Sequence, residues 1–295
     1  MTLIAFALTI GLIYSILSLS VIFSFRVLGF PDLTPDGSFL VGASLGGIIL
    51  INTESIILSL LLAFLIGALF GIITSILHNV LKISKLLSGI LVMTMLYSVS
   101  LRVMNTSNLS LINCNTIWGS NYSEAGQYFN LLLAVIIVIV VFGLLLFFLK
   151  TNIGLKIRAV GDSENTANNI NMNVRQINTL GLAIVNGIAG LSGCIVAQFQ
   201  GFVDVSMGTG LVIICLASII IGEILFKPKN VFVLLLCSVI GMIIYQSIIF
   251  IALRMGLPST DMKIATVVLT IIFISIEKVR GKRNIINSQI GNRNI

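Results

Sequence analysis

The stretch that decides the fold is KTNIGLKIRAVGDSENTANNINMNVR, residues 150–175. It is polar and basic and contains no long apolar run, whereas the whole chain is 57% hydrophobic and only 9% charged. Soluble domains carry about 25% charged residues, so this composition indicates an integral membrane protein. A polar segment of this length between apolar runs must lie in water, where it can contact a soluble partner.

Apolar runs on both sides of this segment are long enough, or nearly long enough, to cross a membrane. A transmembrane helix needs about 17–25 mostly apolar residues. The runs are Leu3–Phe25, Ser38–Ile51, Ile56–Leu81, Leu86–Met104, Phe129–Leu149, Ile177–Gly201, Gly210–Phe226, Val231–Leu253 and Met262–Ile276. Long unbroken runs are typical of helices rather than of a β-barrel. The sequence therefore predicts an all-α polytopic transmembrane bundle of about nine spans, of which the second and seventh are short.

The basic residues predict which side of the membrane each loop faces. If the C-terminal tail is cytoplasmic, nearly all of the 17 lysines and arginines lie in cytoplasmic loops. The exceptions are Arg102, Arg254 and Lys263. This bias predicts an N-terminus outside the cytoplasm and one membrane domain, residues 1–277, with a cytoplasmic loop at 150–176. Residues 278–295 form a basic cytoplasmic tail, and the net charge of +7 needs no nucleic-acid partner.

The first connection, GFPDLTPDGSF at residues 29–39, is unusually polar. The run after it is about 14 residues, or roughly 21 Å of helix, which is too short to cross the membrane unless the polar stretch enters it. Irregular backbone is tolerated there only where protein buries it or where it lines a cavity. One interpretation is a broken second span whose polar residues face a translocation path: Asp32, Thr34, Asp36 and Ser38. The alternative is a cytoplasmic turn with Asp36 capping the helix that follows.

Chemistry-bearing motifs are otherwise absent from the sequence. It contains no HExxH, no nucleophile motif and no GxxxxGK[ST], and its four cysteines lack the spacing of a metal site. Glu223, at the end of an apolar run, is a proton or cation site, the partner of Lys227 or Lys229 in a local ion pair, or a solvated side chain. We expect a chain that is not an enzyme and carries no cofactor or metal of its own.

Residues 161–164, GDSE, predict the start of a short helix within the polar segment. Asp162 is expected to cap this helix, and Glu164 lies in its first turn, where the helix dipole favours an anion. Three apolar residues then recur on one face: Ala167, Ile170 and Val174. Such a helix suits a groove on a soluble protein or the lipid headgroups.

Residues 154–201, GLKIRAVGDSENTANNINMNVRQINTLGLAIVNGIAGLSGCIVAQFQG, resemble the loop and following helix of ABC-importer permeases. The group in question includes the branched-chain amino-acid and ribose permeases, and in particular those of the tryptophan/tyrosine type and uncharacterised ones. FPDLTPDGSFLVGASLG and FVDVSMGTGLVIICLASIIIGEILF fit the same pattern, so the resemblance extends from about Gly11 to Ile276. The Asn-rich NTANNINMN departs from the pattern and leaves the end of the short helix open.

This resemblance implies that the loop couples the membrane part to a separate cytoplasmic ATPase dimer, which would hold ATP and Mg. The matching residues are Arg158, Ala159, Gly161, Asp162, Glu164, Ala167 and Ile170. It also implies an extracytoplasmic solute-binding protein, a second permease copy or sister subunit, and a place in the inner (cytoplasmic) membrane of a bacterium.

The favoured hypothesis is therefore the transmembrane subunit of an ATP-driven importer. It would move a small polar solute, an amino acid or a related metabolite, by alternating access driven through the 162–170 helix. The alternative is an ion-coupled secondary transporter that uses Asp32, Asp36 or Glu223. A membrane scaffold without transport activity is a third possibility.

Overall fold

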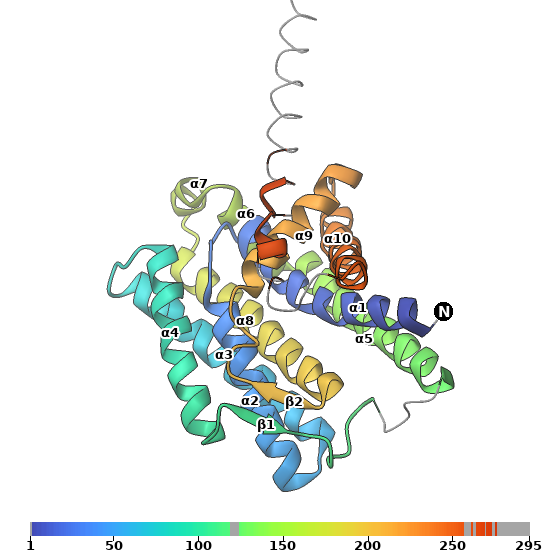
Figure 1. The fold of residues 1–295 in the computed structure, drawn as a ribbon. Helices are drawn as coiled ribbons and strands as arrows, with labels where there is room; N and C mark the ends of the chain where they lie inside the picture. Colours follow the sequence, from blue (N-terminus) through green and yellow to red (C-terminus); the bar gives the residue numbers. More distant parts are fainter. Residues whose placement is uncertain are drawn as a thin grey trace, which may run out of the picture.

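The computed structural model describes residues 2–118, 124–256, 261, 264–268, 270–272 and 275. Its helices confirm the prediction of an all-α polytopic bundle (Figure 1). Within these residues, seven helices are long and apolar enough to cross a membrane, and residues 211–226 form a shorter apolar helix. The ninth predicted run lies partly, and the tail at 278–295 wholly, outside the described residues. The count of nine spans therefore stays a prediction.

The second candidate span begins with the polar stretch. α1 (Thr2–Ile22) continues into a π-helical turn, η1 (Phe23–Val27), and residues 28–33 then lead without regular structure to α2 (Thr34–Thr53). α2 has 20 residues and is about 30 Å long, because residues 34–38 form its first turns. Residues 34–39 of the polar stretch thus belong to the second candidate span, where they are helical and not the irregular backbone that was expected. The irregular backbone lies before this helix, in what we call the 28–33 segment.

Small residues set the packing at the centre of the bundle. α8 (Val174–Gln200) contacts both α2 and α3 (Ile56–Asn79). A Cβ added to Gly42 would lie 2.5 Å from the Cα atom of Gly190, so the backbones of α2 and α8 touch there. Such close approach is typical of membrane helices, which associate by packing rather than by the hydrophobic effect.

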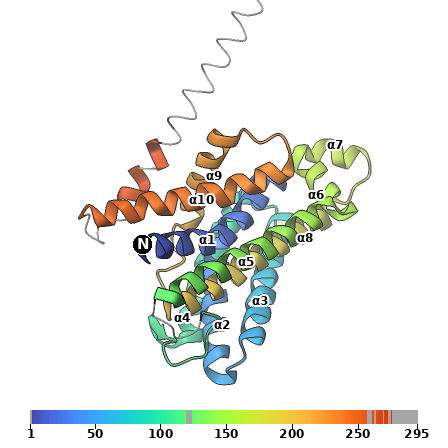
Figure 2. The ribbon, with the colours of Figure 1, turned by 90° about the vertical axis from the view of Figure 1, so that its right-hand side faces the viewer.

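The outer helices present apolar faces to lipid. In α5 (Glu124–Lys150), 17% of an apolar 18-residue stretch is buried within the protein, whereas the corresponding share is 78% in α1, α2 and α8. α4 (Lys85–Met104) and α10 (Val231–Arg254) are intermediate. Figure 2 shows α1 between α5 and α10, and α1 contacts both of them. α1 is thus shielded by helices that themselves face the membrane.

The two ends of the bundle differ in structure. At one end, β1 (Asn108–Ser110) pairs antiparallel with β2 (Phe202–Asp204), and the chain then returns to α9 (Leu211–Phe226). At the opposite end lie α6 (Asn152–Asp162) and α7 (Glu164–Asn169), which form the polar segment (Figure 1).

The prediction that Asp162 caps the short helix is wrong. Asp162 is the last residue of α6, and the hydroxyl of Ser163 accepts the hydrogen bond from the Thr166 amide at the start of α7. The reason is a buried stripe at i, i+3 and i+6, which holds residues 152–162 in a helix of their own. Its members are Gly154, Ile157 and Val160.

The predicted apolar stripe is also wrong. Ala167 is buried against the protein, Ile170 is 59% exposed, and Val174 is already the first residue of α8. The Asn-rich sequence ends α7 at Asn169, and Asn171, with a φ of 57°, turns the chain toward α8. The three apolar residues therefore do not form one face.

Candidate functional site

The polar segment touches the 28–33 segment through two glycines. A Cβ on Gly161 would overlap the carbonyl oxygen of Val27, and a Cβ on Gly29 would lie 2.9 Å from the carbonyl oxygen of Gly161. Gly29 has a φ of +63°, a conformation that side chains disfavour. The end of α6 therefore rests directly on the backbone that leads into α2.

Lys85 ties three elements together at the same place. Its Nζ lies 2.5 Å from Oε1 of Glu164 at the start of α7 and donates to the carbonyl oxygen of Gly29 across 3.3 Å. It also lies 5.3 Å from the centre of the Phe30 ring. Since Lys85 is the first residue of α4, it connects α4 and α7 with the 28–33 segment.

The seven residues that the family resemblance implies for coupling have different environments. The residues that contact the rest of the protein are Gly161, Glu164 and Ala167. The exposed residues are Arg158, Asp162 and Ile170. Ala159 is half-buried. The polar segment therefore has an attached side and a free side, as an element between a soluble partner and the membrane part requires. Its coupling role stays a prediction.

A second cluster is buried where α2 begins. Asp32 is fully buried; its carboxylate accepts from the Thr34 amide at 2.8 Å and from the Asn186 side chain at 3.0 Å. The Ser38 hydroxyl donates to the side-chain oxygen of Asn186 across 2.8 Å, and the hydroxyls of Thr34 and Thr74 are 2.9 Å apart. Removal from water raises the pKa of Asp32, and its hydrogen bonds from Thr34 and Asn186 offset only part of that rise.

Asp36 caps a helix that is distant in the sequence. Its carboxylate accepts hydrogen bonds from the amides of Gly210, at 2.9 Å, and Val212, at 2.7 Å. These amides begin α9, whose N-cap residue, Gly210, has no side chain to do this itself. The alternative in which Asp36 caps its own helix is therefore wrong, because the carboxylate reaches across to α9.

The four residues expected to face a path are thus all buried. Three of them belong to the cluster around Asp32, and the carboxylate of Asp36 binds α9. Asp32, Thr34 and Ser38 are 0% exposed and Asp36 is 4% exposed. Asn186, on α8, joins this cluster and was not singled out from the sequence, since one Asn in an apolar run shows no partner until the fold is known. The proximity of these residues is established, and their contact with a solute stays a prediction.

Glu223 is paired with an arginine from the first helix. Its two carboxylate oxygens accept from Nε of Arg26 at 2.8 Å and from Nη2 at 2.6 Å. The expectation that Lys227 or Lys229 pairs with Glu223 is wrong, because η1 brings Arg26 to the end of α9. The three acids of the ion-coupled alternative are each engaged with donors of the protein itself: Asp32, Asp36 and Glu223.

We expect Glu223→Gln to lower the free energy of unfolding by about 0.5–1 kcal/mol, because the Arg26 side chain is 47% exposed and solvent screens the pair. Solute uptake should stay close to wild type. The control is Glu54→Gln, at an exposed residue, which should change stability by less than about 0.5 kcal/mol. Denaturant unfolding and uptake assays measure both effects. Loss of uptake without loss of stability would instead favour ion coupling.

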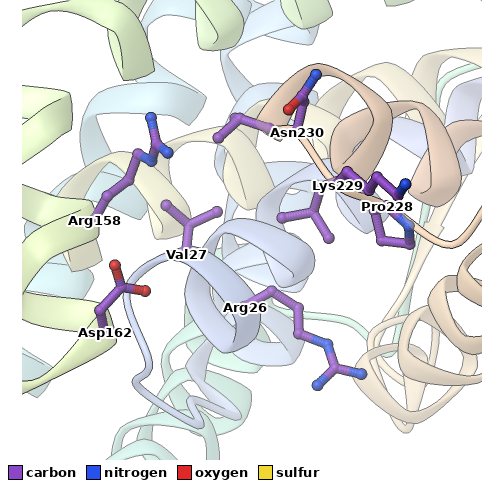
Figure 3. Close-up of a pocket in the computed structure, with 9 residues that line it drawn as sticks. Arg26, Val27, Arg158, Asp162, Pro228, Lys229 and Asn230 are labelled. Carbon is purple, nitrogen blue, oxygen red and sulfur yellow. The ribbon is translucent and has the colours of Figure 1, made fainter.

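A polar pocket of about 190 Å³ opens beside α6 (Figure 3). Arg158 and Asp162 lie on one side, Lys229 and Asn230 on the other. The complete lining is Arg26, Val27, Arg158, Asp162, Pro228, Lys229, Asn230, Val231 and Leu234. Across the described residues, no three side chains of His, Cys, Asp or Glu are placed to hold a metal ion.

Comparison with known proteins places these features in a family. Residues 3–276 match the family described as the permease component of branched-chain amino acid transport systems. The chain is 40% identical, over 267 residues, to a tyrosine transport system permease protein of Clostridioides difficile, with 90% of this chain and 88% of the relative covered. It is 30% identical, over 278 residues, to an uncharacterized protein of Rickettsia prowazekii, with 93% and 96% covered. No solved structure matches.

Proposed function

The chain belongs to the family of permease components of branched-chain amino acid transport systems, and from this we propose that it is the membrane subunit of an ATP-driven amino-acid importer. Its partners would be a cytoplasmic ATPase dimer, which holds ATP and Mg, and a solute-binding protein outside the membrane. A second permease subunit, identical or related, would complete the path in the cytoplasmic membrane of a bacterium. With the basic loops on the cytoplasmic side, the N-terminus would lie outside and α6 and α7 would face the cytoplasm.

The observation that carries this proposal is the position of the polar segment. Its free side leaves room for a soluble partner, while its attached side rests on Val27 through Gly161 and on Lys85 through Glu164. Movement of α7 would therefore reach the 28–33 segment through Lys85, and movement of α6 would reach it through Gly161. That segment contains Asp32, whose hydrogen bond from Asn186 connects the 28–33 segment with α8. One continuous set of contacts thus joins the free side to the buried cluster, as transmission of a conformational change requires.

We infer an aromatic amino acid, with tyrosine as the first candidate, as the transported solute. The support is the 40% identity over nearly the full length of a tyrosine permease. Inward transport would follow the alternating-access scheme, in which closure of the ATPase dimer rearranges the spans around the path.

Reconstitution tests the proposal. The permease, its ATPase and its solute-binding protein are placed in proteoliposomes, and uptake of labelled tyrosine is measured with and without ATP. We expect uptake only when all three proteins and ATP are present. Tyrosine uptake by the permease alone, driven by an ion gradient, would overturn the proposal in favour of secondary transport.

We expect Ile170→Glu to lower ATP-dependent uptake by about tenfold. Ile170 is 59% exposed at the end of α7, so a charge there costs little folding stability, while its burial against a partner would be lost. Ile170→Leu, which keeps an apolar side chain, should transport normally. Binding of the purified ATPase to each variant distinguishes a docking defect from a path defect. Normal ATPase binding and uptake by Ile170→Glu would place the contact elsewhere.

A further inference from the structure

The pocket beside α6 carries a net positive charge even when the ion pair between Arg26 and Glu223 is taken into account. Arg26 is neutralised by Glu223, but Arg158 and Lys229 make no ion pair in the described part of the chain. Among the residues that line the pocket, Asp162 alone carries a carboxylate. The pocket therefore retains positive charge, and an anion is the ligand it would favour.

The pocket also includes the beginning of a long helix. Asn230 and Val231, at the N-terminus of the 24-residue α10, form part of its wall. Asn230 makes no side-chain capping hydrogen bond, so the first amides of α10 remain available to a ligand. Backbone amides of this kind add to the attraction that the two cations exert on an oxyanion such as phosphate.

Apolar side chains border the charged part of the pocket. Val27, Val231 and Leu234 belong to its lining. Phe226, 43% exposed, and Phe232, 50% exposed, stand immediately before and after the 227–231 stretch. Exposed phenylalanine rings suit contact with lipid acyl chains, and the ammonium group of a nearby lysine can extend to the headgroups.

We propose that this pocket binds the phosphate of an anionic phospholipid, with Arg158 and Lys229 as its ligands. A phosphodiester would sit between the two cations and the amides of α10, and its acyl chains would lie along Phe226 and Phe232. This arrangement favours a lipid over free phosphate, because free phosphate would make no use of the apolar border. The bound lipid would connect α6 with the loop between α9 and α10. Lipid binding does not depend on the proposed function, although the leaflet concerned follows from the orientation given above.

The test is lipid binding by the purified full-length permease in a neutral detergent, followed by native mass spectrometry. Phosphatidylglycerol is titrated, with phosphatidylcholine as the zwitterionic comparison. We expect Arg158→Gln combined with Lys229→Gln to weaken phosphatidylglycerol binding by about tenfold or more, since each basic residue near an anionic headgroup contributes substantially. The matched control, Lys156→Gln, removes an exposed cation of α6 that does not line the pocket. It should bind like the wild type.

Each outcome decides the proposal. Selective loss of phosphatidylglycerol in the double variant, with an unchanged melting temperature and no effect of Lys156→Gln, supports it. Equal binding of the two lipids by the wild type, or equal losses in both variants, overturns it. Displacement of the lipid by millimolar inorganic phosphate would identify free phosphate as the ligand instead. If the double variant binds lipid like the wild type but binds the ATPase more weakly, the pocket is a contact site for the ATPase and the lipid site is overturned.

Discussion

Replacing Asp36 with alanine is expected to lower the free energy of unfolding by about 3 kcal/mol, because one buried and one partly buried amide lose their acceptor. The amides belong to Gly210 and Val212, at the start of α9. Asp36 is 4% exposed, so water does not readily replace the carboxylate. The midpoint of thermal unfolding in detergent should fall by roughly 6–12 °C.

Two further variants define how this result is interpreted. Asp36→Asn keeps one acceptor oxygen and should lose about half as much stability. Asp162→Ala removes an exposed carboxylate and should change the free energy of unfolding by less than about 0.5 kcal/mol. If Asp36→Ala melts at the wild-type temperature, the carboxylate does not hold α9, and the contact between α2 and α9 is without energetic consequence.

Replacing Gly161 with valine is expected to reduce ATP-dependent uptake by at least about tenfold, while the ATPase continues to hydrolyse ATP. Any Cβ at this position overlaps the carbonyl oxygen of Val27, so the end of α6 must move away from the 28–33 segment. Motion of α7 would then no longer reach α2. Parallel measurement of tyrosine uptake and ATP hydrolysis in the reconstituted system checks this expectation.

Gly143 provides the matched control. It lies on α5, where an added Cβ meets no atom within 4 Å. Gly143→Val should therefore leave uptake unchanged. Uptake by Gly161→Val at the level of Gly143→Val would show that the contact between α6 and Val27 is dispensable. Loss of both uptake and membrane insertion would indicate a folding defect, and Gly161→Ala, a smaller change, then separates the two effects.

The fold class follows from the sequence because apolar length and charge bias act locally along the chain. The run after residue 37 is too short to span a membrane, and this favoured entry of the residues before it into the membrane, without showing that they are helical. In the structure, α2 begins at Thr34 and includes the last residues of the polar stretch. Periodicity within residues 150–175 was less informative, since the buried contacts that decide where α6 ends involve Val27, more than a hundred residues away.

The candidate site is predictable in its residue types and not in its contacts. Asp32 and Asp36 were singled out because they lie in a polar connection before an apolar run that is too short to span the membrane. Their partners are distant in the sequence: Asn186 for the first, and Gly210 and Val212 for the second. The prediction of a lysine partner for Glu223 was wrong for the same reason. Lys227 and Lys229 are close in the sequence, but the folded chain brings Arg26 to Glu223. One signal was present in the sequence, namely the glycines at 29 and 161, each of which marks a close backbone contact.

The long-range cap on α9 has a consequence for how the protein is made. Asp36 and its two donors are 174 and 176 residues apart, so the ribosome delivers the carboxylate to the membrane long before either amide exists. Until α9 emerges, the first half of the chain contains an acid without its native partners. Biogenesis of the N-terminal helices is therefore complete only when the C-terminal half has been inserted, and truncated chains that end before residue 210 are expected substrates for membrane quality-control proteases.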